Sequence, residues 1–289
     1  ITRFLVSKPR FTAKWSVDIA GGKVGELDEE FDTAWFNFDK PLQPGESREG
    51  QLTVTREHKG FTDGGNDFSL LHNGTFIDNF TLFPNFGYNQ SWQLSDRHKR
   101  RQHDLEPLKR ANKLEDKAFY NESFFGKGVG FIDFEAVIST DKDQFAIAPG
   151  YIQSEIVEGD RRIFHYKMDS PMVNFYSIMS AELMSKKEVY KGISIEVYYD
   201  EKHDMNVDRM IESVRDSIDY FSENFGPYQH KQLRIIEFPG YRSFAQSFAN
   251  TVPYSEKIGF ISDLRDGDHI EPAYYVTAHE VAHQWWGHQ

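Results

Sequence analysis

Short runs in which apolar and polar residues alternate fill most of the chain before residue 200. An early set lies at 15–19, 34–38 and 51–55, and a later set lies at 131–138, 144–148, 163–166, 175–179 and 193–199. Alternation places the apolar side chains of an extended strand on one face. Many strands with few helices predict an all-β domain over residues 1–200, folded as a sandwich or a curved open sheet.

The period changes after Asp200. Apolar residues recur at helical spacing between Val207 and Phe225, with acidic residues on the opposite face, and Gly226-Pro227 ends the pattern. This change predicts a domain boundary near residue 200, with residues 201–289 forming a second, α/β part.

Further elements follow the predicted helix. A strand is expected at 233–238, a loop at 239–253, and a strand or extended segment at 258–261. A last helix opens at Glu271-Pro272, because proline is favoured in the first helical turn. The charged stretch at 95–122 has no regular period and is expected to be a long surface excursion.

Composition limits the classes of function. The chain has a net charge of −12, which argues against nucleic-acid binding because phosphates require a basic face. The basic run 97–101 is expected to be a solvated loop, with a patch for anionic lipid or an acidic partner as the alternative. Cysteine is absent, so any metal must be bound by histidine or carboxylate side chains.

The sequence has no apolar run of membrane-spanning length and no secretory leader. It begins at Ile1 without an initiator methionine. We therefore expect a soluble segment of a longer polypeptide, and the compartment of that parent protein stays open.

One short motif carries chemistry: His279-Glu280-Val281-Ala282-His283. Residues four apart are neighbours on a helix, so His279 and His283 can bind one zinc ion. Glu280 points away from that face, which suits a general base better than a metal ligand. Two surface histidines on an ordinary helix are the alternative that the five residues alone leave open.

The wider stretch His279 to Gly287 resembles the signature helix of the M1 family of zinc aminopeptidases, which are HExxH gluzincins. Agreement at Gln284, Trp285 and Gly287 extends the resemblance, and so do 40–46, 169–176 and 220–228 upstream. The resemblance implies a saddle-like all-β N-terminal domain followed by a thermolysin-like α/β catalytic domain that is truncated here. It also implies zinc as the cofactor and a peptide as the substrate.

In this family the third zinc ligand is a Glu roughly 19 residues past the second His, and a tyrosine that assists the transition state lies further on. Both positions fall after Gln289. The isolated chain is therefore expected to bind zinc weakly and to be inactive. An exposed apolar surface around Tyr274, Tyr275, Val281, Trp285 and Trp286 is expected to promote self-association.

The family binds the free amino terminus of a peptide with the Glu of a Gly-Ala-Met-Glu-Asn strand. The corresponding residues here are Ala245, Gln246, Ser247 and Phe248, with Ser247 in place of that Glu. A hydroxyl cannot neutralise an ammonium group, which weakens the case for strict aminopeptidase action. The stretch is similar to that of M1-like domains attached to bacterial ABC-type transporter permeases, which implies a membrane-attached parent.

Two functions follow. The leading hypothesis is a metallopeptidase that hydrolyses peptide bonds from the amino terminus of peptides, with Glu280 as general base. The alternative is a non-catalytic peptide-binding or sensing domain of a transporter-associated membrane protein. Ser247 favours the alternative, and the intact Glu280 favours catalysis.

Overall fold

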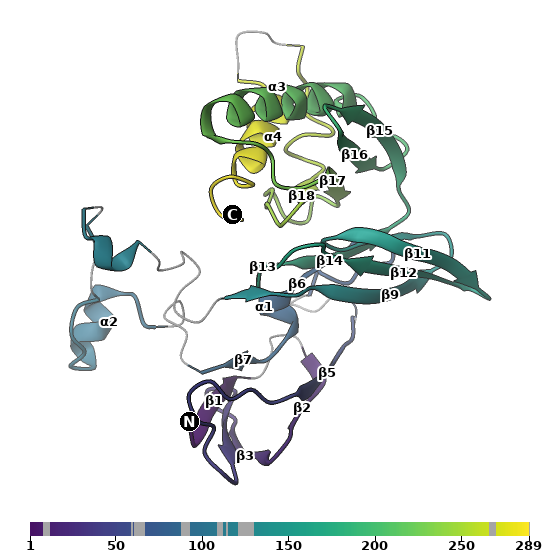
Figure 1. The fold of residues 1–289 in the computed structure, drawn as a ribbon. Helices are drawn as coiled ribbons and strands as arrows, with labels where there is room; N and C mark the ends of the chain where they lie inside the picture. Colours follow the sequence, from purple (N-terminus) through teal and green to yellow (C-terminus); the bar gives the residue numbers. More distant parts are fainter. Residues whose placement is uncertain are drawn as a thin grey trace. The chain divides into compact units, whose positions relative to one another are not determined.

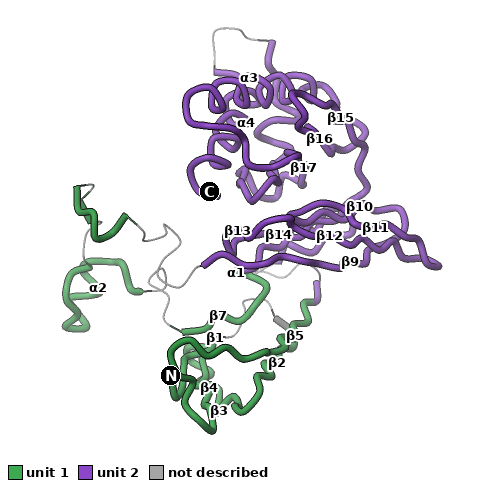
Figure 2. Tube along the Cα trace, in the orientation of Figure 1, with its two compact units in different colours: residues 1–56, 80–129 green, residues 57–79, 130–289 purple. Residues whose placement is uncertain are grey.

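The computed structural model of the chain describes residues 1–7, 12–58, 60, 67–87, 93–108, 112–113, 115–120, 130–265 and 270–288. Contacts divide the chain into two compact units, residues 1–56 with 80–129 and residues 57–79 with 130–289 (Figure 2). Strands predominate over helices among the described residues (Figure 1). The predicted fold class, an all-β region followed by a partial α/β region, is confirmed.

The first unit is built on an antiparallel sheet of order β3-β4-β1-β7. Its strands are β1 (Arg3–Ser7), β3 (Gly22–Asp28), β4 (Thr33–Phe38) and β7 (Asn85–Phe86), and a separate pair joins β2 (Thr12–Ile19) to β5 (Gly50–Arg56). Phe4 lies opposite Phe36 in the register, and their rings stack with centroids 5.1 Å apart. Cross-strand aromatic pairs of this kind stabilise the sheet.

The basic run 97–101 was expected to be a loop, and that expectation is wrong. It forms the short helix α2 (Arg97–Gln102), because the side chain of Asp96 accepts a hydrogen bond from Lys99 N at 2.7 Å and caps the first turn. A 3-10 helix follows at Lys117–Phe119. Residues 109–111, 114 and 121–122 of the predicted excursion lie outside the described residues.

Three small antiparallel sheets open the second unit. Their orders are β11-β12-β9, β10-β14-β6 and β13-β8. Phe164 and Tyr166 point from β12 into a buried cluster with Phe134 and Met172. The strand bounds are β6 (Thr75–Asp78), β8 (Phe131–Ile132), β9 (Glu135–Asp141), β10 (Phe145–Ile147), β11 (Tyr151–Glu158), β12 (Arg161–Lys167), β13 (Met172–Val173) and β14 (Ser177–Ala181), and the short helix α1 (Asn79–Leu82) follows β6.

The same unit contains a mixed sheet of order β15-β16-β17-β18. The strands are β15 (Met184–Tyr190), β16 (Ile193–Tyr199), β17 (Gln232–Phe238) and β18 (Thr251–Ser255), and the last three run parallel. Helix α3 (Val207–Phe225) makes the crossover between β16 and β17, as a parallel pair requires. Its apolar face, including Met210 and Val214, is buried against Val197 and Ile235 in the core of this sheet.

Two expectations for the connecting segments are wrong. Strand β18 begins inside the predicted loop 239–253. The sequence did not predict it because position 253 is a proline, which is rare within strands. The carbonyl oxygen of Pro253 faces the 245–248 stretch and accepts from Gln246 N at 3.0 Å, so pairing with β17 does not require an N–H from this residue. Residues 258–261, expected as a strand or extended segment, form turns instead, with Ile261 N donating to Glu256 O at 3.1 Å. That run is apolar because Phe260 is buried against Tyr254.

The mixed sheet contains strands from both sides of residue 200, since β15 and β16 precede it and β17 and β18 follow it. The change of period in the sequence therefore coincides with the first long helix. The boundary between residues 1–200 and 201–289 stays a prediction. None of the helices in the described part of the chain combines the length and apolar character that crossing a bilayer requires.

Candidate metal centre

Helix α4 (Pro272–Ala282) carries the histidine motif. Pro272 occupies its first turn, and Arg209 on α3 donates from Nε to Glu271 Oε2 at 2.6 Å beside that end. The hydroxyl of Ser213 on α3 donates to Tyr274 O at 2.7 Å. The helix therefore packs on α3 through specific polar contacts as well as through the buried core.

The two histidines converge. His279 lies in the last turn of α4, and His283 is its C-cap with φ −61° and ψ −19°, so the helical spacing of four residues is kept. Their Nε2 atoms are 3.2 Å apart, and the two rings are nearly perpendicular at 89°. Two nitrogens bound tetrahedrally to zinc at about 2.0–2.1 Å would be about 3.3 Å apart. The pair fits a shared zinc ion.

The protonation states also suit a metal. Burial lowers the pKa of His279, and the charge of His283 acts in the same direction. His283 Nδ1 lies 3.2 Å from Trp286 O. A proton on Nδ1 would donate to that carbonyl and leave the Nε2 lone pair directed at the metal position.

Glu280 lies on the buried side of α4 and is 5% exposed. Its Oε2 atom is buried and has no hydrogen-bond partner among the described residues. Burial raises the pKa of the Glu280 carboxyl to about 7, against the lowering effects of the charge on His283 and a backbone hydrogen bond from Ser247. A carboxyl poised near neutrality can both accept and donate a proton.

The predicted substrate stretch lies beside α4 and forms an extra strand on β18. Gln246 N donates to Pro253 O at 3.0 Å, and Phe248 N donates to Thr251 O at 2.8 Å. By the alternation of an antiparallel pair, the main-chain groups of Ala245 face away from β18. The stretch therefore has one edge directed away from the sheet.

Ser247 is not a free ligand. It is 1% exposed, and its Oγ accepts a hydrogen bond from Gln284 Nε2 at 2.6 Å. Its carbonyl oxygen lies 2.9 Å from His288 Nε2. Ser247 therefore joins this stretch to the end of the signature motif.

The motif alone did not predict the role of Gln284. Its side chain is fully buried, donates to Phe248 O at 2.8 Å and accepts from Asn250 N at 3.0 Å. Asn250 occupies the left-handed region with φ 50°, at the tip of the hairpin before β18. In the sequence, only the asparagine within Phe-Ala-Asn-Thr could have predicted a turn with a left-handed residue here.

The aromatic tail is packed more fully than expected. Val281 and Trp285 were expected to lack partners, but they are buried, at 0% and 5% exposure. Trp285 donates from Nε1 to Gly226 O at 2.9 Å and packs on Phe221. The Tyr274 hydroxyl donates to Asp216 at 2.6 Å. Only Tyr275 and Trp286 of the five residues are exposed, at 58% and 50%.

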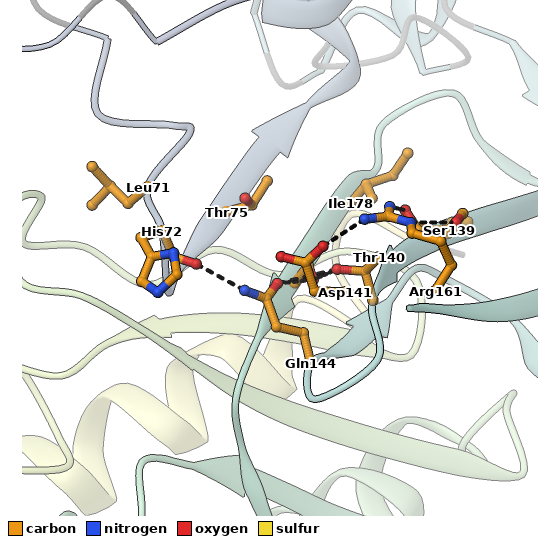
Figure 3. A pocket seen from close by; sticks show the side chains of 11 residues that line it. Leu71, His72, Thr75, Ser139, Thr140, Asp141, Gln144, Arg161 and Ile178 are labelled. Carbon is orange, nitrogen blue, oxygen red and sulfur yellow. Dashed lines mark hydrogen bonds and ion pairs between the residues drawn. The ribbon is translucent and has the colours of Figure 1, made fainter. Parts of the chain in front are cut away.

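An open pocket lies away from the predicted site residues, between β9, β14 and the segment before β6 (Figure 3). Its polar groups satisfy one another: Gln144 Nε2 donates to His72 O at 2.8 Å, and Arg161 pairs with Asp141 at 2.6 Å. Ser180 Oγ donates to Gln144 Oε1 at 2.6 Å. These contacts explain the pocket as part of the packing of the strands.

No protein-family profile matches the chain. A stretch of 156 residues, 53% of the chain, is 24% identical to Tricorn protease-interacting factor F2 of Thermoplasma acidophilum. The match covers 20% of that protein, so the chain spans about a fifth of the relative's length. This distant likeness agrees with the M1 resemblance at the level of a peptidase-related protein.

Proposed function

We propose that the chain is a fragment of an M1-like zinc metallopeptidase. The observation that supports this most directly is the convergence of His279 Nε2 and His283 Nε2 at 3.2 Å, on a helix that also carries a buried, unpaired carboxylate oxygen of Glu280. The zinc ligand expected after Gln289 would complete the set. The isolated chain is accordingly proposed to be inactive.

His279 and His283 would hold zinc through Nε2. When bound, the metal would polarise a peptide carbonyl and make water more acidic. Glu280 would accept the proton of the attacking water at Oε2 and pass it to the leaving amine. Its burial keeps this oxygen away from competing donors among the described residues.

The outer edge at Ala245 would align an extended peptide as an added strand. None of the residues Ala245 to Phe248 is a carboxylate that could bind an ammonium group, and the Ser247 hydroxyl is already bonded to Gln284. Recognition would therefore rest on main-chain hydrogen bonds. We propose weak discrimination between free and blocked amino termini.

The Glu280→Gln substitution tests catalysis in a full-length protein that continues past Gln289. The variant is expected to retain zinc, because Glu280 is not a ligand, and to lose peptide hydrolysis by about 10²- to 10⁴-fold. Zinc content is measured by elemental analysis and hydrolysis with a fluorogenic peptide. Unchanged turnover would reject Glu280 as the base.

A second candidate is a non-catalytic peptide-binding domain of a transporter-associated membrane protein. The buried Ser247 hydroxyl favours it, because the site lacks the anchoring charge of an aminopeptidase. Aminoacyl and amino-blocked peptides separate the two functions. Hydrolysis of either class supports the peptidase, whereas binding of both classes without hydrolysis supports sensing.

A further inference from the structure

A second group of side chains of types that can bind metals lies at the carboxyl ends of the three parallel strands of the mixed sheet. Glu237 lies near the end of β17, Glu256 directly follows β18, and His203 lies in the segment that leaves β16 for α3. The carboxyl ends of parallel strands lie at one edge of a sheet. The topology therefore brings these three side chains to the same edge.

The three side chains are close enough to share one ion. One ligand atom from each of His203, Glu237 and Glu256 lies within 4.8 Å of the others. His203 Nδ1 is hydrogen bonded to Glu237 Oε1. The other oxygen, Glu237 Oε2, accepts from Asp200 N at 2.7 Å, which fixes the orientation of the carboxylate.

Glu256 is held in place as well. Its Oε1 atom accepts a hydrogen bond from Gly240 N at 2.7 Å. A Cβ atom at position 240 would lie 2.7 Å from the same oxygen, so a larger residue there would require the Glu256 side chain to shift. The loop after β17 therefore supplies a main-chain donor that orients the carboxylate of Glu256.

The negative charges around His203 favour binding of a cation. The Glu237 side chain is only 4% exposed, and its ion-pair partner in the described part of the chain is an imidazole. Asp200 and Glu256 add further negative charge around His203. Neither Glu237 nor Glu256 forms an ion pair with a lysine or arginine among the described residues. A buried carboxylate without a permanent cation is costly.

We propose that His203, Glu237 and Glu256 form a second divalent-cation site, separate in its residues from the histidines of α4. One imidazole and two carboxylates favour zinc over calcium or magnesium, which prefer oxygen ligands alone. The cation replaces the proton that joins His203 to Glu237. Its role is structural, because it ties the start of the α3 connection to the ends of β17 and β18.

The test first removes the two histidines of α4, so that zinc binding by His203, Glu237 and Glu256 can be measured without them. The 289-residue chain carrying His279→Ala and His283→Ala is titrated with zinc by calorimetry, and cobalt absorption provides a second readout. We expect one equivalent of zinc to bind, with no comparable binding of calcium. This result does not depend on whether α4 forms a peptidase site.

Two substitutions in that background identify the ligands. Glu237→Gln keeps the hydrogen bond from Asp200 N but removes the charge, and Glu256→Gln does the same for Gly240 N. Each is expected to weaken zinc binding by about tenfold or more. Glu201→Gln, at an exposed position of the same segment, is the matched control and is expected to bind zinc unchanged.

The outcomes are distinct. Circular dichroism first establishes which variants fold, and Glu256→Gln decides the question if the more buried Glu237→Gln does not. Weaker zinc binding in the folded variants, with the control unchanged, supports the site. Absence of zinc binding in the background chain, or unchanged affinity in a folded Glu237 or Glu256 variant, overturns it and leaves a hydrogen-bonded cluster only.

Discussion

At the residue scale, Gln284 makes the connection between the signature motif and the predicted substrate stretch. Replacing it with leucine would remove the donors to Ser247 Oγ and Phe248 O and the acceptor of Asn250 N. Buried groups left without partners destabilise a protein. We expect Gln284→Leu to lower the free energy of unfolding by about 2–4 kcal/mol, measured by urea denaturation.

The exposed Gln153 provides the control for that substitution. Among the described residues its side chain bonds only to the nearby Tyr151 O at 2.9 Å, so Gln153→Leu should change stability by less than about 0.5 kcal/mol. Equal losses of unfolding free energy in Gln284→Leu and Gln153→Leu would show that the buried hydrogen bonds of Gln284 do not stabilise the fold.

His230 predicts a dependence of stability on pH. It is 6% exposed, and burial lowers its pKa to about 4, with the charge of His288 in the same direction and that of Asp169 opposed. The unfolded chain, with an ordinary histidine pKa, binds the proton first as pH falls. Stability should therefore be complete above about pH 6.5 and should decrease by up to about 3 kcal/mol towards pH 4.

Urea unfolding at several pH values measures this slope. His230→Phe should flatten it, whereas the exposed His103→Phe should not. His288 contributes a slope of the same sign, because burial also lowers its pKa to about 4. A slope that persists unchanged in His230→Phe would assign the effect to other groups.

The predictability of the site follows from sequence distance. His279 and His283 could be paired from the sequence because four residues fix their geometry on one helix. The bond between Ser247 and Gln284 joins positions 37 residues apart. The sequence could suggest a substrate role for Ser247, but the partner that buries its hydroxyl depends on how α4 packs against the hairpin.

At the scale of elements, α3 is the best predicted part of the chain. Its apolar face and the Gly226-Pro227 stop set the bounds Val207–Phe225 that the structure has. β18 was missed because all five of its residues are buried while its sequence includes a proline and polar residues. Burial of a strand depends on its neighbours in space, which the local sequence pattern does not contain.

Arg234 shows how one element supports another. Its side chain is 1% exposed on β17 and donates from Nη2 to Ala148 O at 2.6 Å and Gly150 O at 2.9 Å, next to the start of β11. Arg234→Met would leave both carbonyls without this donor. We expect a loss of about 2–4 kcal/mol in the free energy of unfolding.

The control for this variant is Arg215→Met on α3, where a half-exposed guanidinium pairs with Glu188 at 3.2 Å. Exposed ion pairs contribute about 0–1 kcal/mol, so the control should be nearly neutral. Thermal denaturation of both variants is the measurement. A neutral Arg234→Met would mean that water replaces the guanidinium without cost.

At the scale of the whole molecule, an exposed aromatic patch consists of Tyr220, Phe225 and Trp286, at 60%, 54% and 50% exposure. The rings of Phe225 and Trp286 are in contact, with centroids 4.7 Å apart. Contiguous apolar surface favours association. We expect the 289-residue chain to self-associate with increasing concentration in sedimentation velocity experiments.

Trp286→Gln should weaken that association, and Trp35→Gln should not. Trp35 is similarly exposed, at 45%, but belongs to the first compact unit, whereas the three residues of the patch belong to the second. A chain that stays monomeric at high concentration would contradict the expectation. So would an equal effect of the two substitutions.

Asn250 restricts which sequences can adopt this arrangement. Its φ of 50° favours glycine, asparagine and aspartate, yet its side-chain oxygen accepts from Gly150 N, Arg234 Nη2 and Thr251 Oγ1. Glycine would keep the backbone and lose these bonds, and larger residues would keep neither. Position 250 thus requires both a left-handed backbone and a side-chain acceptor. Among natural residues, asparagine and aspartate meet both requirements.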